Sequence, residues 1–216
     1  MTRADASSAL PPAAHLGRSA LRALPLQIGY VVAAAVLGLA GAPVQPWLVA
    51  LLVIALWTPT LAELVFRTTL PLVFQVHFLI FLTAGAFAGS ALSLYRAFPN
   101  WDTIVHADSG VLLAWLGLLL VRRAEERSEA PSPRWFALTV TAMTPMAFAA
   151  AWEICEYASD ALVGTVAQGG LHDTMTDMLA GTLGGLATVA VVMVVPRPRS
   201  IVPDSLAQRR AEAPPV

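Results

Sequence analysis

Six long apolar runs dominate this sequence and limit what the chain can fold into. They cover roughly residues 25–42, 47–64, 69–95, 103–121, 135–159 and 174–195. A run of about 20 apolar residues can cross a bilayer as an α-helix, and backbone polar groups inside a bilayer must be bonded within the structure. The runs therefore predict an all-α, polytopic transmembrane helix bundle with about six spans.

The composition agrees with a membrane protein. Apolar residues make up 57% of the chain and charged residues 12%, and the mean hydropathy is +0.68, whereas a soluble domain carries about 25% charged residues. Cys155 is the single cysteine, which excludes an intrachain disulfide and a thiolate metal cluster. Because no basic patch with interleaved aromatic residues is present, we expect the lipid bilayer, and not nucleic acid, as partner.

The two ends of the chain differ from its apolar centre. Residues 1–23 are small, polar and proline-bearing, and are predicted to form a flexible N-terminal tail. Residues 196–216 lack apolar periodicity and are predicted to be a disordered cytoplasmic C-terminal tail. The transmembrane helical domain is then expected to cover residues 24–195.

The positive charges indicate an orientation. Every basic residue is an arginine, and all but Arg96 fall on the same side as the N-terminus if the six runs cross the membrane in turn. Short loops rich in arginine stay in the cytoplasm. Both termini are therefore predicted to be cytoplasmic.

Acidic residues interrupt the last three apolar runs at one depth. Asp102 lies at the start of the fourth run, Glu153 and Glu156 near the end of the fifth, and Asp173 and Asp177 at the start of the sixth. An acid at membrane depth costs about 2.5–3.5 kcal/mol and usually faces a bundle interior or a watery cavity. Alternating spans bring all of these acids to the outer, periplasmic side, which predicts one shared site.

Helical spacing adds a histidine to this group, because His106 follows Asp102 by one turn on the same face. Crowded carboxylates need shared protons or a cation, and carboxylates with an imidazole suit Mg²⁺, Mn²⁺, Ca²⁺ or Zn²⁺. For Asp102 and Asp173, capping of a helix N-terminus is an equal alternative. The predicted metal ligands are Asp102, His106, Glu153, Glu156, Asp173 and Asp177.

Two pairs of glycines have the small-xxx-small spacing, Gly85 with Gly89 and Gly181 with Gly185. Such pairs usually let helices pack closely. In the sixth run, close packing would bring the carboxylates within ligand distance of one another. A homodimer contact through one of these faces is the weaker alternative.

The ordered motifs resemble those of bacterial inner-membrane proteins of the YjdF type, a domain of unknown function, which look distantly similar to VanZ-like membrane proteins. The similarity covers roughly residues 45–190 and is carried by W101-D102-x-x-x-H106-x-x-S109-G110, W152-E153-x-x-E156-Y157, G164-T165 and D173-T174-x-x-D177-M178. The resemblance implies a multi-pass protein of the bacterial cytoplasmic (inner) membrane. It implies no particular reaction.

Three functions fit these observations. The favoured one is a binding or structural membrane protein whose cation, or shared protons, join helices. The second is a metal-dependent hydrolase or transferase that acts on a lipid headgroup or lipid-linked phosphate, although no nucleophile or phosphate-binding arginine cluster is visible and no catalytic residue can be assigned. The third is a transporter, although the inner halves of the last three spans contain no ionisable residue.

Overall fold

The computed structural model describes residues 12–42, 44, 46–66, 70–98, 100–128 and 131–194. Within these ranges the chain is helical and contains no strand, and six segments are long and apolar enough to cross a membrane. This result confirms the predicted fold class. Residues 1–11 and the predicted C-terminal tail lie outside the described residues. The spans are Leu21–Leu39, Pro46–Leu64, Leu72–Ala91, Trp101–Glu125, Arg134–Val163 and Leu171–Val194.

The first helix, α1 (Pro12–Leu39), begins earlier than expected. Residues 12–23, which the sequence assigned to a flexible tail, belong to this helix. The physical reason is local, because proline is well tolerated in the first turn of a helix and the alanines, leucines and arginines that follow are strong helix formers. The predicted boundary at residue 23 is therefore replaced by a helix start at Pro12.

The second span is broken into two helices, α2 (Pro46–Ala55) and α3 (Thr58–Phe66). A turn at Leu56 and Trp57 separates them. Pro59 therefore lies in the first turn of a new helix, where its missing N–H costs nothing, and not in the interior of a continuous one. Because α3 runs on to Phe66, Glu63 is helical and not part of the turn expected around residues 63–67.

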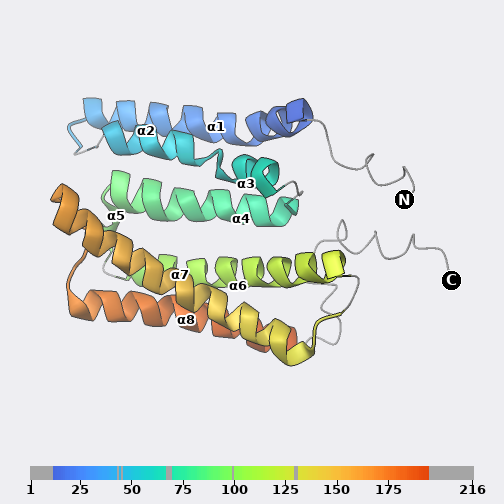
Figure 1. Ribbon diagram of the computed structural model, residues 1–216. Helices are drawn as coiled ribbons and strands as arrows, with labels where there is room; N and C mark the ends of the chain where they lie inside the picture. The colour runs from blue at the N-terminus through green and yellow to red at the C-terminus, as the bar shows by residue number, and fades with distance from the viewer. Residues whose placement is uncertain are drawn as a thin grey trace. The chain divides into compact units, whose positions relative to one another are not determined.

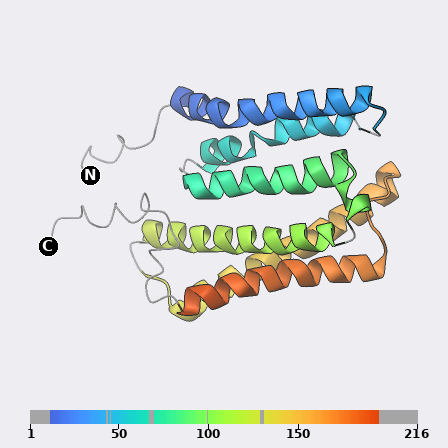
Figure 2. The ribbon, with the colours of Figure 1, turned by 180° about the vertical axis from the view of Figure 1, so that it is seen from behind.

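The helices form two compact units, with α1 to α5 in unit 1 and α6 to α8 in unit 2. In unit 1, α4 (Leu72–Leu82) continues into the π-helix η1 (Thr83–Ala91), and the short α5 (Leu94–Ala97) follows. Figures 1 and 2 show α1 beside α2 in this unit. The Tyr30 ring of α1 stacks on Phe87 with centroids 3.9 Å apart, and the hydroxyls of Tyr30 and Thr83 are 2.6 Å apart.

A buried polar network joins three helices of unit 1. The Oε1 atom of Glu63 accepts hydrogen bonds from the Leu70 backbone N–H at 2.7 Å and from the Gln75 side-chain amide at 2.8 Å. Gln75 in turn accepts a hydrogen bond from the Arg22 guanidinium. Glu63 and Gln75 are each only 4% exposed. The carboxylate of Glu63 therefore receives hydrogen bonds from groups of the same chain.

Unit 2 consists of α6 (Trp101–Ser128), α7 (Arg134–Val163) and α8 (Leu171–Val194), and each helix contacts the other two. Figures 1 and 2 show α7 lying obliquely across α6 and α8. Glycines set the separation of α6 and α8, because a Cβ at Gly110 would lie 2.0 Å from the Gly181 carbonyl oxygen, and one at Gly184 would lie 2.0 Å from the Ala107 carbonyl oxygen. These two helices thus meet backbone to backbone.

Both glycine pairs that the sequence singled out lie inside their own units. Gly85 and Gly89 are buried in unit 1, and a Cβ at Gly89 would overlap the Tyr95 ring. In unit 2, Gly185 accommodates the ring of Pro145 from α7, since a Cβ there would lie 2.3 Å from Pro145 Cγ. Close helix packing is therefore the role that these glycines have in the fold.

Candidate metal centre

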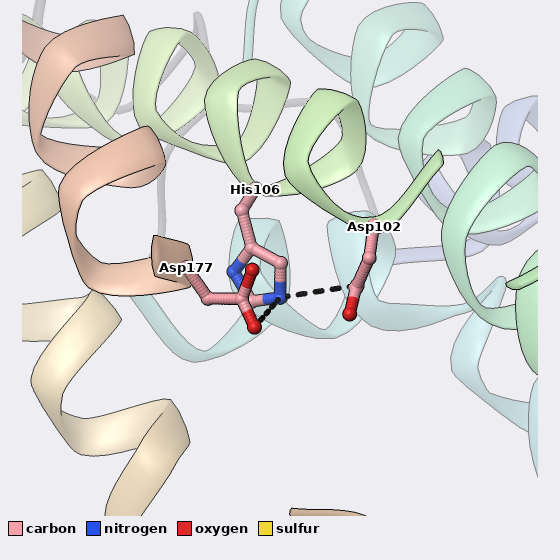
Figure 3. A group of neighbouring side chains, drawn as sticks. All are labelled: Asp102, His106 and Asp177. Atoms are coloured by element: carbon pink, nitrogen blue, oxygen red, sulfur yellow. Dashed lines mark ion pairs between the residues drawn. The ribbon is translucent and has the colours of Figure 1, made fainter. Parts of the chain in front are cut away.

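Helix α6 presents the first two members of the site. Asp102 lies in its first turn and His106 one turn further along the same face. The Nε2 atom of His106 is 3.4 Å from Asp102 Oδ1, and Figure 3 shows both side chains directed to the same point. Ser109, on the same face, donates its hydroxyl to the His106 backbone carbonyl at 2.7 Å and does not join the side-chain group.

Helix α8 supplies the third member, Asp177. Its Oδ2 atom is 3.8 Å from His106 Nε2, and the Asp177 side chain is 4% exposed. Asp102, His106 and Asp177 each offer one ligand atom, and these three atoms lie within 4.8 Å of one another. Figure 3 shows His106 Nε2 between the two carboxylates. We call these three residues the Asp–His–Asp group.

Glu153 of α7 lies at the level of this group. Helices α7 and α8 are antiparallel and touch where a Cβ at Gly181 would lie 3.4 Å from the Ala149 Cβ. Glu153 is one turn beyond Ala149, and Asp177 is one turn before Gly181. Glu153 is 5% exposed and interacts electrostatically with His106 and Asp177. Its Oε1 atom is buried and accepts no hydrogen bond from the described residues.

The other two predicted ligands are close to the group but engaged elsewhere. Glu156 accepts a hydrogen bond from the Trp152 indole N–H at 2.8 Å, and Asp173 accepts one from the Gly169 backbone N–H at 3.1 Å. Both still act on the site through their charge, Glu156 on His106 and Asp173 on Asp177. Of the six predicted ligands, the structure thus brings three together as possible ligands of one ion, with Glu153 adjacent.

A carboxylate that is not a ligand fixes the connection between α7 and α8. Asp160 accepts hydrogen bonds from the Thr165 hydroxyl at 2.6 Å and from the backbone N–H groups of Ala167 and Gln168 at 2.7 and 3.0 Å. Asp173 holds the far end of the same loop through Gly169. These bonds set where α7 ends relative to the start of α8, and hence where Glu153 stands relative to Asp177.

Sequence reasoning missed the buried network of Glu63 and Gln75 in unit 1. The link after the second span was expected as a short turn around residues 63–67. The signal that could have found a helical Glu63 is Pro59 directly after Thr58, because a proline is well tolerated at the first position of a helix. A helix that starts there carries Glu63 into its second turn.

The chemistry available at the Asp–His–Asp group is that of a cation site. Carboxylate oxygens and an imidazole nitrogen are ligands for divalent ions. A buried carboxylate oxygen without a partner, as at Glu153, is costly and calls for a ligand such as water or an ion. No side chain of the group carries a positive charge other than the imidazole when protonated.

The six apolar spans define a polytopic helical membrane protein, and in unit 2 the carboxylates of Asp102 and Asp177 gather with His106. Residues 23–198 match the family model described as "Predicted membrane protein (DUF2238)", so the chain belongs to this family. The match fits the YjdF-type resemblance of the motifs, while the VanZ-like relation stays a prediction. Neither a curated protein nor a solved structure matches the chain.

Proposed function

We propose that unit 2 binds a divalent cation through Asp102, His106 and Asp177, with Glu153 as a further ligand, in a structural or binding role. The ion would join α6, α7 and α8 at one end of the unit. The observation that carries this proposal is the buried, unpartnered Oε1 of Glu153 beside the Asp–His–Asp group. An ion bound there would give Glu153 a partner and offset part of the negative charge of the crowded carboxylates.

The proposed location is the periplasmic side of a bacterial cytoplasmic membrane. The arginine distribution supports this orientation, because all basic residues except Arg96 would then lie on the cytoplasmic side with both termini. The site would stand at the depth of the lipid headgroups. We also propose the distant relation to VanZ-like membrane proteins. No particular reaction is part of the proposal.

The charge of the site favours binding over phosphate chemistry. The predicted ligands comprise five carboxylates and one imidazole. The two positive charges of a single ion leave such a group negative, which repels the phosphate of a lipid-linked substrate. Enzymes that act on phosphates usually add arginine or lysine clamps, and the Asp–His–Asp group has none.

The packing of unit 2 favours binding over transport. Beyond the site, α6 and α8 meet through Gly110, Gly181 and Gly184, and α7 closes on Gly185 through Pro145. Backbone contacts this close leave no room between these helices for an ion to pass. A carrier instead keeps polar groups near the membrane midplane.

Metal analysis of the purified full-length protein tests the proposal. We expect about one equivalent of divalent metal in the wild type after dialysis. Loss of two ligands in the Asp177→Ala/Glu153→Ala variant should remove it. Asp108→Asn is the matched control, because Asp108 lies on α6 but outside the Asp–His–Asp group, and this variant should retain the metal. Equal metal content in all three proteins would refute the proposal.

A further inference from the structure

We infer that the bound ion is a borderline transition-metal ion in four-fold coordination, with Zn²⁺ as the best match, and not Mg²⁺ or Ca²⁺. This inference rests on the proposed function and adds the identity of the ligand. Three features of the site carry it: the central position of a nitrogen donor, the spacing of the donor atoms and their number.

The nitrogen donor stands between the two carboxylates. His106 Nε2 is 3.4 Å from Asp102 Oδ1 and 3.8 Å from Asp177 Oδ2, and Figure 3 marks both pairs with dashed lines. An ion shared by both aspartates must therefore also be adjacent to the imidazole. Imidazole nitrogen suits zinc and related ions, whereas Mg²⁺ and Ca²⁺ prefer sites made of oxygen alone.

The spacing of the donor atoms matches a tetrahedron around zinc. Bonds of about 2.0–2.2 Å to nitrogen and oxygen at tetrahedral angles place neighbouring ligand atoms about 3.4 Å apart. Two of the three observed separations, 3.4 and 3.8 Å, are close to this value, and the third, between the two carboxylates, is within 4.8 Å. Octahedral Mg²⁺ with bonds of about 2.0–2.1 Å would require neighbouring ligands only about 2.9 Å apart.

The number of donors also limits the choice. The Asp–His–Asp group offers three ligand atoms, and the fourth would come from Glu153, whose buried Oε1 has no partner among the described residues, or from one water. Four donors complete a zinc shell. Ca²⁺ takes about 6–8 oxygens, and Mg²⁺ keeps several waters. The side chains of His106 and Asp177 are 14% and 4% exposed, and only that of Asp102, at 34%, is reached more freely by water.

The experiment measures the affinity of full-length protein in detergent for Zn²⁺, Mg²⁺ and Ca²⁺, each added alone to metal-stripped protein. It also records the visible absorption of the Co²⁺-loaded form, since tetrahedral Co²⁺ absorbs far more strongly than octahedral Co²⁺. We expect Zn²⁺ to bind at least about 100-fold more tightly than Mg²⁺, because an imidazole ligand suits zinc and Mg²⁺ prefers oxygen ligands. The Co²⁺ form should show the strong tetrahedral bands.

A His106→Asp variant keeps an oxygen donor where the imidazole was. It should lose at least about tenfold in the ratio of Zn²⁺ to Mg²⁺ affinity, and the Asp108→Asn control should keep the wild-type ratio. If Mg²⁺ or Ca²⁺ binds as tightly as Zn²⁺, or if Co²⁺ gives only weak octahedral bands, the inference is wrong while the cation site itself stands. If no ion binds to any of these proteins, both the inference and the proposed function are overturned.

Discussion

His106 Nε2 and Asp177 Oδ2 lie 3.8 Å apart although they belong to different helices, α6 and α8. Their proximity depends on the absence of side chains at Gly110 and Gly184, where the two helices touch through their backbones. The close contact and the site are therefore one structural feature.

The glycine contact can be tested with Gly110→Ala. The added Cβ would lie 2.0 Å from the Gly181 carbonyl oxygen, so α6 and α8 must separate. Overpacking of this kind costs about 1–3 kcal/mol, and each kcal/mol lowers the Tm of a chain this size by about 2–4 °C. Thermal unfolding in detergent measures the effect. Gly38→Ala is the control, because a Cβ there meets nothing within 4 Å. Equal Tm values for the two variants would contradict the observed contact.

The effect of Glu153→Gln on the Tm should depend on whether the protein has bound metal. In stripped protein the variant removes a buried carboxylate that repels its neighbours, so the Tm should rise by about 2–4 °C for each kcal/mol gained. In the presence of Zn²⁺ the variant should gain less stability than the wild type, since a ligand is lost. Glu156→Gln serves as comparison, and its smaller effect follows from the bond of Glu156 to Trp152. A fall in the Tm of stripped Glu153→Gln would show that this carboxylate is already satisfied.

The loop between α7 and α8 should loosen in Asp160→Ala. This change removes the acceptor of three hydrogen bonds, and two of these bonds fix backbone N–H groups of the loop. Hydrogen exchange at the amides of Ala167 and Gln168 should become faster, while α6 amides beyond Gly110 stay protected. Unchanged exchange at these two amides would mean that Asp160 does not hold the loop.

The buried network of unit 1 can be tested with a double-mutant cycle on Glu63 and Gln75. Gln75→Ala removes the side-chain donor 2.8 Å from Glu63 Oε1 and leaves a buried carboxylate short of one bond. We expect a loss of about 1–3 kcal/mol. The cost should be smaller in a Glu63→Gln background, with a coupling energy of about 0.5–3 kcal/mol. Additive effects in thermal unfolding would argue against the bond, and metal content should be unaffected throughout.

The orientation can be tested by cysteine labelling in intact cells, in a Cys155→Ser background. Val166 lies in the α7–α8 loop and is 93% exposed, so Val166→Cys should react with a membrane-impermeant maleimide from outside. Pro131→Cys, in the exposed connection between α6 and α7, should react only after the membrane is opened. The reverse pattern would place both termini outside.

The sequence was sufficient for features that depend on length and periodicity. The six spans follow from runs of apolar residues, and the pairing of Asp102 with His106 follows from helical spacing on α6. The ligand role of the six predicted residues stays a prediction, because proximity is not coordination. Periodicity places a side chain on a face of its helix, but the partner that it meets is set by how helices pack.

Three features of the structure show this limit. Asp173 was expected either to be a ligand or to cap the start of its helix, and the structure gives it the Gly169 N–H as partner just before α8. The break at Leu56 and Trp57 places Pro59 near the start of a new helix, although the proline could equally have sat inside a continuous one. The start of α1 at Pro12 follows from the helix propensity of the residues after it. Their small and polar composition predicted a tail instead.

The bonds around Glu63 have a consequence for how the protein is made. Its donors are the Leu70 N–H and the Gln75 amide, and Arg22 binds Gln75 in turn, so all of these groups lie within the first 75 residues of the chain. Chains are synthesised from the N-terminus and their parts fold in that order. The first three spans can therefore complete these hydrogen bonds during translation. Glu153 is synthesised later, and in the proposed site its partner is an ion taken up from the surrounding compartment.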